Sequence, residues 1–314
     1  MTSVHNSGVE IVDVAARDGL QNVSTFVPTA TKIELIRKVL AAGVKRLEIG
    51  SFVSPKHVPQ MADMEDVVRG LGPLDGVRAM ALVPNSKGAE RALAAGVTDL
   101  IFVISMTDAH NLSNVRRPTA ASIQDLSTLL AERDPDARLR VRVGIATAFH
   151  CPFEGDVGVA SVMATMARIV AIRPGLELAL SDTTGMALPP HVAALARAAL
   201  SEFGERASFV FHGHDTAGFG VANVLAAFEA GITSFDGAVG GLGGCPFAPG
   251  ATGNIATEDL VYLFERMGVS TGIDLERLLE AADLAASLPG AQGGGHVRGL
   301  PRARLLRGES ACAA

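Results

Sequence analysis

Short apolar segments alternate with longer stretches of helical periodicity along most of this 314-residue chain. Eight apolar segments have the length and aliphatic content of buried strands. They span residues 9–14, 45–51, 77–83, 98–105, 138–146, 176–181, 207–214 and 233–241. The stretches between them predict amphipathic helices such as "TATKIELIRKVLAAG" and "GVANVLAAFEAG", and several of these end in a glycine that suits a left-handed helix stop.

Eight strands that alternate with helices predict a parallel α/β fold, and their number favours a closed (β/α)8 barrel, or TIM barrel. An open doubly wound sheet is the alternative, which we disfavour because no glycine-rich dinucleotide motif follows the first strand. We expect one catalytic domain over residues 1–285. The sequence of residues 286–314 is rich in Gly and Arg and has little periodicity, which predicts a short, irregular and flexible C-terminal tail.

Composition and charge narrow the class of protein. A net charge of −6 argues against a nucleic-acid-binding surface. Three cysteines, an odd number, do not form a disulfide framework and fit the reducing cytoplasm. The first residues do not have the pattern of a signal peptide, and no apolar run is long enough to span a membrane. We therefore expect a soluble cytoplasmic protein without a nucleic-acid or membrane partner.

Polar residues gather near the carboxyl ends of five predicted strands, where a (β/α)8 barrel carries its catalytic groups. They are Arg17, Asp18 and Gln21 after the first strand, Glu48 in the second, Asp182 after the sixth, His212, His214 and Asp215 at the seventh, and Cys245 and Asn254 after the eighth. Each residue alone has an ordinary structural explanation. An aspartate before a glycine, for example, is typical of a turn.

Four of these positions together predict a metal centre. His212 and His214 are two residues apart in a predicted strand, so their side chains point the same way. Asp18 and Asn254 would lie at the same rim of the barrel. Carboxylate, imidazole and amide ligands suit Mg²⁺ or Mn²⁺, and suit Zn²⁺ less well. An octahedral ion with these four ligands would keep two positions for substrate or water.

The sequence resembles the 3-hydroxy-3-methylglutaryl-CoA lyase family of the DRE-TIM metallolyase superfamily. The similar segments extend from about residue 9 to residue 285. They are "RDGLQN", "SFVSPKHVPQM", "HGHDTAG", "GLGGCPFAPGATGNIATEDLVY" and "TGIDLERLLE". The glycine-rich loop that carries the cysteine, together with the segment that follows it, is the most specific of these motifs. Claisen-condensing relatives share the two histidines but differ in that loop.

The resemblance implies a role for each site residue. It places the metal ligands at the four positions derived above, the catalytic arginine at Arg17 and the loop cysteine at Cys245. It also implies the supporting acids Glu48, Asp182, Glu258 and Asp13. In a retro-Claisen cleavage the metal would lower the pKa of the substrate hydroxyl, and Arg17 would stabilise the enolate. Cys245 would donate a proton to that enolate. His212 would be a metal ligand and would also take part in proton transfer.

The implied reaction cleaves 3-hydroxy-3-methylglutaryl-CoA to acetyl-CoA and acetoacetate, a step of leucine degradation. Val23 stands where the family usually has Glu, and the loops at 105–118 and 146–150 also depart from the family pattern, which leaves the acyl group open. Citramalyl-CoA or a 3-hydroxy-3-alkylglutaryl-CoA is the alternative substrate.

Two further alternatives concern the activity itself. A Claisen-condensing synthase is disfavoured by the Cys245 loop. A silent barrel that only binds a metal or a CoA ester is disfavoured by the presence of both Arg17 and Cys245. The resemblance also implies a homodimer, in which Cys312 would be either a bystander, which we favour, or part of an intersubunit disulfide.

Overall fold

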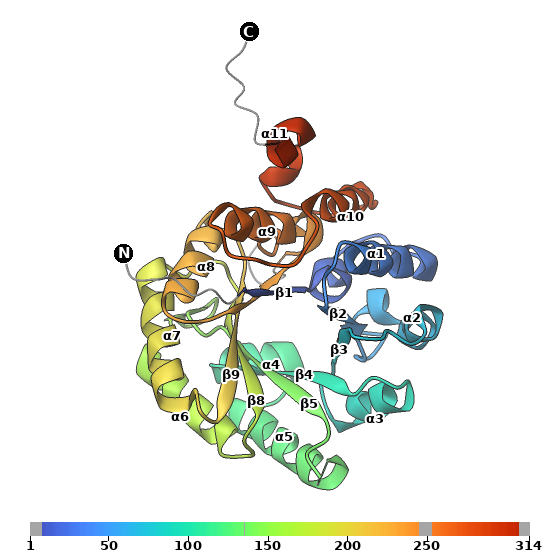
Figure 1. Cartoon of the computed structure of the whole chain (residues 1–314). Coiled ribbons are helices and arrows are strands. Elements are labelled where there is room, and N and C mark those ends of the chain that lie inside the picture. Colours follow the sequence, from blue (N-terminus) through green and yellow to red (C-terminus); the bar gives the residue numbers. More distant parts are fainter. Residues whose placement is uncertain (1–7, 135, 245–252, 308–314) are drawn as a thin grey trace.

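A computed structural model describes residues 8–134, 136–244 and 253–307. Eight parallel strands close into a barrel in the order β1-β10-β9-β8-β5-β4-β3-β2 (Figure 1). They are Glu10–Asp13 (β1), Arg46–Ser51 (β2), Arg78–Leu82 (β3), Asp99–Ser105 (β4), Arg140–Ala146 (β5), Leu176–Asp182 (β8), Ala207–Gly213 (β9) and Ser234–Gly237 (β10). The predicted (β/α)8 barrel is confirmed, and each predicted strand coincides with a barrel strand to within a few residues.

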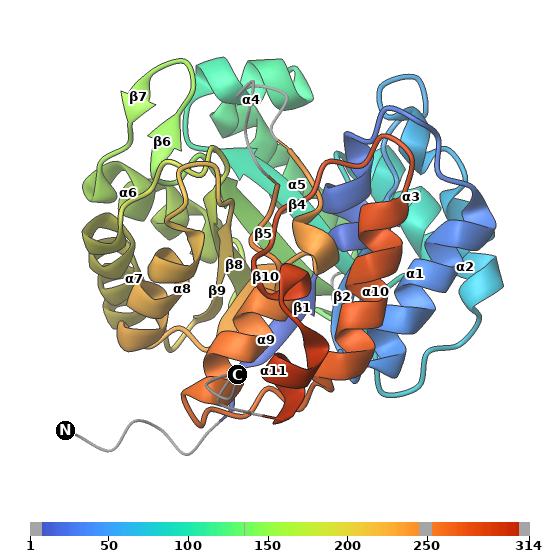
Figure 2. The same cartoon turned by 90° about the horizontal axis from the view of Figure 1, so that it is seen from above.

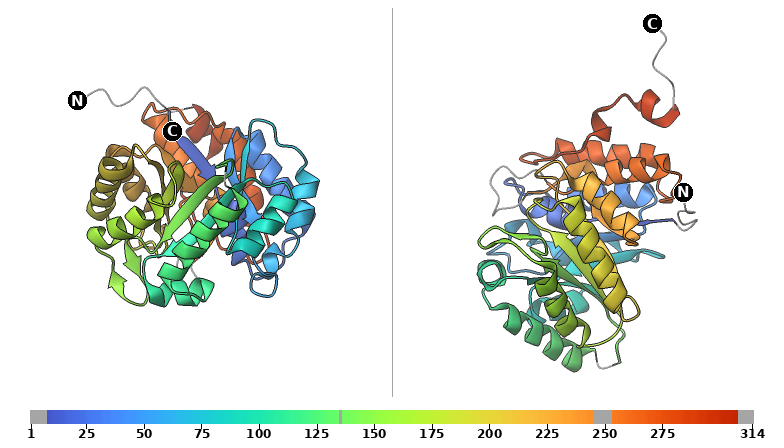
Figure 3. Two further views of the ribbon diagram at one scale, coloured as in Figure 1. Left: turned by 90° about the horizontal axis from the view of Figure 1, so that it is seen from below. Right: turned by 90° about the vertical axis from the view of Figure 1, so that its left-hand side faces the viewer.

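The helices form an outer layer around the strands (Figure 3). They are Thr29–Ala41 (α1), Met64–Leu71 (α2), Ser86–Ala94 (α3), Asp108–Val115 (α4), Thr119–Arg133 (α5), Val159–Val170 (α6), Pro189–Phe203 (α7), Gly220–Glu229 (α8), Thr257–Arg266 (α9) and Leu275–Ser287 (α10). Short helical turns lie in the loops that connect barrel strands to the helices after them: η1 (Ala15–Gly19), η2 (Pro59–Met61) and η3 (Val239–Gly241). Among the described residues, no helix has the length and apolar content needed to cross a bilayer.

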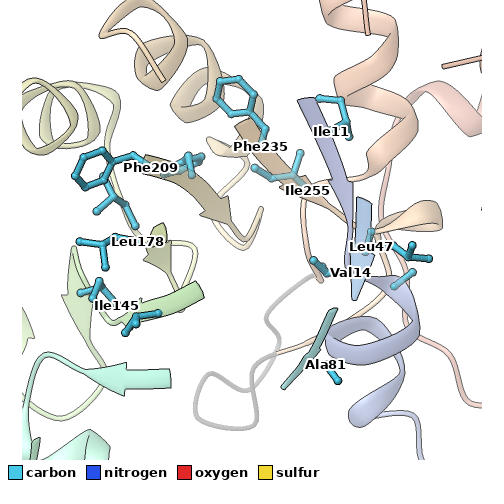
Figure 4. Close-up of a cluster of buried hydrophobic side chains, with 14 of the residues drawn as sticks. Ile11, Val14, Leu47, Ala81, Ile145, Leu178, Phe209, Phe235 and Ile255 are labelled. Atoms are coloured by element: carbon cyan, nitrogen blue, oxygen red, sulfur yellow. The ribbon is translucent and has the colours of Figure 1, made fainter. Parts of the chain in front are cut away.

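The apolar core lies between the strands and the helices, where side chains such as Leu47, Leu178 and Phe235 gather (Figure 4). Successive residues of a strand point to opposite faces, so the same strands also present side chains to the barrel interior. In β5, Val143 and Ile145 belong to the core, whereas Arg142 and Gly144 line a cavity inside the barrel. This alternation is what brings charged residues of distant segments together.

Two features of the structure were not predicted from the sequence. The segment around "HCPFEG" contains a small antiparallel hairpin of His150–Cys151 (β6) and Gly155–Asp156 (β7), which lies at the same end of the barrel as α4 (Figure 2). Residues 288–307, which we expected to be part of an irregular tail, contain a helical turn, Val297–Gly299 (η4), and a helix, Arg302–Arg307 (α11).

The segment 288–307 packs against the barrel domain. Val297 and Leu305 are buried together with Leu279 of α10. The backbone N–H groups of His296 and Val297 donate to the carboxylate of Asp259 in α9. This segment therefore packs against the barrel although its hydrophobic periodicity is low. A few apolar side chains and the buried carboxylate of Asp259 hold it there.

Candidate active site

A cavity of about 680 Å³ opens at the carboxyl ends of the barrel strands. Six of the site residues expected from the sequence line it, and they come from segments that are almost 200 residues apart. These lining residues are Arg17, Asp18, Gln21, Glu48, His212 and His214. The closed barrel therefore brings the N-terminal motif and the two histidines to one surface, as the sequence predicts.

The turn η1 presents Arg17 and Asp18 to this cavity. The backbone N–H groups of Arg17, Asp18 and Gly19 all donate to the carbonyl of Val14, which holds the turn tightly on the end of β1. Gly19 is required here because an added Cβ would lie 2.8 Å from the Cβ of Leu242. Both functional side chains are thereby directed inward and are almost fully buried.

Arg17 is held by two carboxylates. Its Nε donates to Oε2 of Glu48 in β2, and its Nη1 donates to Oδ1 of Asp18. These two acids outweigh the opposing effect of burial and raise the pKa of Arg17. The guanidinium is therefore fixed in direction and permanently charged beside the cavity.

Asp18, His212 and His214 form a group that could hold a metal ion. One potential ligand atom from each residue lies within 4.8 Å of the others. Burial would raise the pKa of Asp18, but Arg17 and His214 more than offset this and hold it well below the usual range. The carboxylate is therefore ionised at neutral pH, as a metal ligand must be.

Asn254 completes the predicted set of ligands. Its Nδ2 donates to Oδ2 of Asp18 at 2.9 Å, which places the amide beside the carboxylate. Its Oδ1 is buried and has no hydrogen-bond partner among the described residues. Unsatisfied buried acceptors are rare in folded proteins, and a cation would satisfy this one. The donor set of this structure therefore fits Mg²⁺ or Mn²⁺.

Asp236 in β10 is a site residue that the sequence analysis missed. Its Oδ2 accepts a hydrogen bond of 3.1 Å from Nδ1 of His212, which leaves Nε2 as the ring nitrogen that could bind a metal. This contact raises the pKa of His212 against the effect of burial. Carboxylates commonly orient a ligating histidine in this way. The available signal was an acid inside the apolar strand "TSFDGAVGG".

Three of the predicted acids lie behind the cavity wall. Asp182 accepts hydrogen bonds from the backbone N–H groups of Met186 and Ala187, and burial raises its pKa. Asp13 accepts from the N–H of Val239 and the hydroxyl of Thr257. These residues are not among those that line the cavity. Their contacts fix loops and turns that carry the site.

Glu258 is also behind the wall, and it accepts two bonds from the N–H of Gly240. Burial raises its pKa to about 8, and burial raises that of Asp13 to about 6. Cys245 and Cys312 lie outside the described residues. Gly244, the last described residue before Cys245, accepts a hydrogen bond of 2.6 Å through its carbonyl from the Nδ2 of Asn22, so the loop leaves the barrel next to η1.

Known proteins resemble this chain over nearly its full length. The family described as HMGL-like matches residues 8–285. The (R)-citramalyl-CoA lyase of Chloroflexus aurantiacus is 47% identical over 89% of this chain and 91% of its own length. A hydroxymethylglutaryl-CoA lyase of Bacillus subtilis is 40% identical over 87% of this chain and 91% of its own length.

A solved structure supports the same relationship. The HMG-CoA lyase of Acinetobacter baumannii, in complex with coenzyme A and 3-methylmalate, superimposes with a TM-score of 0.85 and is 39% identical. The match covers 92% of this chain and 93% of that protein.

Proposed function

The chain belongs to the HMGL-like family, and on this premise we propose that it is a divalent-metal-dependent acyl-CoA lyase that performs a retro-Claisen cleavage. Its relatives by name are carbon–carbon lyases of acyl-CoA esters. The observation that carries the proposal is the joint placement of Arg17 and the Asp18–His212–His214 group on one cavity wall. A protein that only bound a CoA ester would not need both.

The reaction requires one proton to leave and another to arrive. When the substrate hydroxyl gives its proton to a base in the active site, the oxygen becomes a carbonyl as the adjacent carbon–carbon bond breaks. The electron pair of that bond remains on the acetyl-CoA fragment as an enolate, which then takes up a proton. A divalent cation held by Asp18, His212, His214 and Asn254 would lower the pKa of the hydroxyl.

Arg17 is the residue we assign to the enolate. Its fixed guanidinium can direct N–H groups at the thioester oxygen, where negative charge develops. Glu48 serves this role indirectly, because it holds Nε of Arg17. Such preorganised donors stabilise the transition state without reorganising during the reaction.

Cys245 is the residue we assign to the proton that the enolate takes up. It directly follows the glycine-rich segment 240–244, whose last residue, Gly244, lines the cavity. A thiol is a better proton donor than a hydroxyl because its pKa is closer to neutrality.

We expect Cys245→Ser to fold, to bind Mn²⁺ normally and to lose most of its turnover. It should also resist inactivation by iodoacetamide, to which the wild type should be sensitive. Cys151 is buried and should not interfere. Normal turnover by this variant would remove Cys245 from the mechanism.

Two acyl groups are candidates for the substrate. The motifs of the chain resemble the hydroxymethylglutaryl-CoA lyases, whereas the 47% identity favours (R)-citramalyl-CoA. The solved relative holds 3-methylmalate, a five-carbon hydroxy diacid of the same size as citramalate. We therefore propose both esters as candidate substrates. Cleavage of (R)-citramalyl-CoA would yield acetyl-CoA and pyruvate, and cleavage of 3-hydroxy-3-methylglutaryl-CoA would yield acetyl-CoA and acetoacetate.

The deciding experiment incubates the full-length protein and Mg²⁺ with both esters and a 3-hydroxy-3-alkylglutaryl-CoA, and identifies the products by chromatography. Acetyl-CoA should appear with pyruvate or with a 3-oxo acid. Exhaustive chelation should abolish turnover, and Mg²⁺ or Mn²⁺ should restore it. A protein that cleaves none of these esters in Mg²⁺ or Mn²⁺ is not the lyase proposed here.

A further inference from the structure

Arg142 of β5 lies between the two halves of the active site. Its Nη1 lies 2.9 Å from both carboxylate oxygens of Asp236, the acid that orients His212. The same nitrogen lies 3.8 Å from Oε1 of Glu48, the acid that holds Arg17. A continuous series of ionisable groups thus connects Arg17 with His212 through Glu48, Arg142 and Asp236.

We propose that Arg142 is a positioning residue, whose single guanidinium fixes the orientation of the metal-binding histidine His212 and of the enolate-binding Arg17 relative to each other. It acts on His212 through Asp236 and on Arg17 through Glu48. This inference rests on the proposed function, because it assumes that both groups act on the same substrate.

The sharing of Asp236 supports this role. Its Oδ2 accepts from Nη1 of Arg142 and also from Nδ1 of His212. Because both oxygens of the carboxylate contact Nη1, rotation of the carboxylate would break these contacts. The His212 ring is therefore held in a direction that is set by β5, although the ring itself belongs to β9.

Burial makes these contacts effective. Arg142, Asp236 and Glu48 are each at most 2% exposed. Ionic contacts in such surroundings are screened little by water, and leaving one partner unpaired is costly. The other edge of the guanidinium contacts Glu177 through Nε, so the plane is anchored on two sides. Lysine has one charged nitrogen and cannot reproduce this arrangement.

A competing role for Arg142 is direct contact with substrate. The residue lines the cavity, and its Nη2 is buried without a hydrogen-bond partner among the described residues. Binding of a substrate carboxylate by Nη2 would affect KM. Positioning of His212 would instead affect the binding of metal in the absence of substrate, together with kcat.

The test compares Arg142→Lys with the full-length wild type. Mn²⁺ affinity is measured by electron paramagnetic resonance without substrate, and kcat and KM are measured on the ester that the wild type cleaves. We expect Mn²⁺ affinity to weaken about tenfold, the lower end of the loss typical when the support of a metal ligand is disturbed, because Asp236 itself remains. We expect kcat to fall at least about tenfold and KM to change less than about threefold.

Arg46→Lys is the matched control. Arg46 is as buried as Arg142 and also contacts Glu177, but its other acid partner is Glu10 at the far end of the barrel. The Arg46→Lys variant should have a lower unfolding midpoint, as Arg142→Lys should. Its Mn²⁺ affinity should stay near that of the wild type. The double variant of Arg142→Lys and Asp236→Asn should bind Mn²⁺ little more weakly than Asp236→Asn alone, because both act through the same ring.

Two results would overturn the proposal. Wild-type Mn²⁺ affinity in folded Arg142→Lys would show that the residue is structural. A rise in KM with unchanged Mn²⁺ affinity and kcat would make it a substrate-binding residue. If the wild type cleaves none of the esters, the proposed function is rejected instead. The Mn²⁺ affinities are measured without substrate, so they test the role of Arg142 independently of that result.

Discussion

At Asp18, one carboxylate connects the parts of the site. Its Oδ1 accepts from Nη1 of Arg17, while its Oδ2 accepts from Asn254 and lies 3.4 Å from Nε2 of His214. An acid buried among neutral groups would take up a proton, but here the arginine keeps it ionised. In the proposed mechanism, the adjacent pair Arg17–Asp18 would provide both the cation for the enolate and an anionic ligand for the metal.

Replacement of Arg17 should affect the transition state more than binding. We expect Arg17→Gln to lower kcat at least about a hundredfold, the scale seen when one oxyanion donor is lost, with little change in KM. Steady-state kinetics on the preferred ester provides the measurement. A variant that loses only affinity for substrate would show that Arg17 binds coenzyme A instead.

The buried carboxyl of Glu258 should make stability depend on pH. Its pKa is about 8 in the folded protein against an ordinary value of 4.5, so the folded state retains a proton that the unfolded state releases. The stabilisation is complete below pH 4.5 and is lost as the pH rises through 8. Glu258→Gln should therefore gain stability relative to the wild type as the pH rises from 5 to 8.5.

Urea unfolding of Glu258→Gln and of the wild type at both pH values measures this difference. Glu280→Gln, a substitution of an exposed glutamate in α10, is the control and should show no comparable trend. A constant difference between Glu258→Gln and the wild type at the two pH values would contradict the raised pKa.

At the scale of elements, the strand–helix repeats end in loops of defined backbone geometry. Before β5, the carboxylate of Asp134 accepts from the N–H groups of Arg138 and Leu139 and fixes the turn. Within that turn, exposed Ala137 has a φ of 51°, a left-handed conformation that L-residues adopt at a cost. This turn is strained, and it is remote from the cavity.

Ala137→Gly should relieve that strain. We expect a gain of about 0.5 kcal/mol in the free energy of unfolding, because the left-handed conformation costs about 1–2 kcal/mol and the added freedom of the unfolded chain offsets part of it. Ala137→Val should lower stability, since a β-branched residue is disfavoured there. Denaturant titration measures both, and turnover should stay unchanged. Stabilisation by Val would refute the strain argument.

At the scale of the whole molecule, the segment 288–307 links the outer helices to the start of the glycine-rich loop. The N–H of Gly294 donates to the carbonyl of Gly240, and the N–H of Gly243 donates to that of Gln292. An added Cβ on Gly241 would lie within 3 Å of Gly294, so the two backbones approach closely. The position of η3 and of the described residues 242–244 after it thus depends on the C-terminal segment.

Deletion of residues 288–314 should therefore reduce both stability and turnover. Loss of the burial of Val297 and Leu305 should cost about 3 kcal/mol or more. We expect kcat to fall several-fold because η3 loses its contacts. Deletion of residues 308–314 alone, which removes Cys312, is the control and should behave as the wild type. Full turnover by the longer deletion would show that the segment only covers the barrel.

The sequence by itself determined the barrel and the six cavity-lining residues expected from it. Strand periodicity depends on local residue order, and closure of eight parallel units leaves one place for the strand ends. It was also sufficient to predict Asp18, His212 and His214 as neighbours. It did not determine the packing of residues 288–307, whose composition resembles a linker.

Only the tertiary structure brought Arg142 and Asp236 together with His212. Asp236 is the one charged residue of β10, and Arg142 is accompanied in β5 only by Arg140 at the start of the strand. Nothing nearby in the sequence says what either of them faces. Their placement depends on a contact across the barrel interior between residues 94 apart in the sequence, in which Arg142 of β5 meets both oxygens of Asp236 of β10, a strand that does not neighbour β5. Local pattern can place a charge on the inner face of a barrel, but which charges meet there depends on the tilt and order of all the strands.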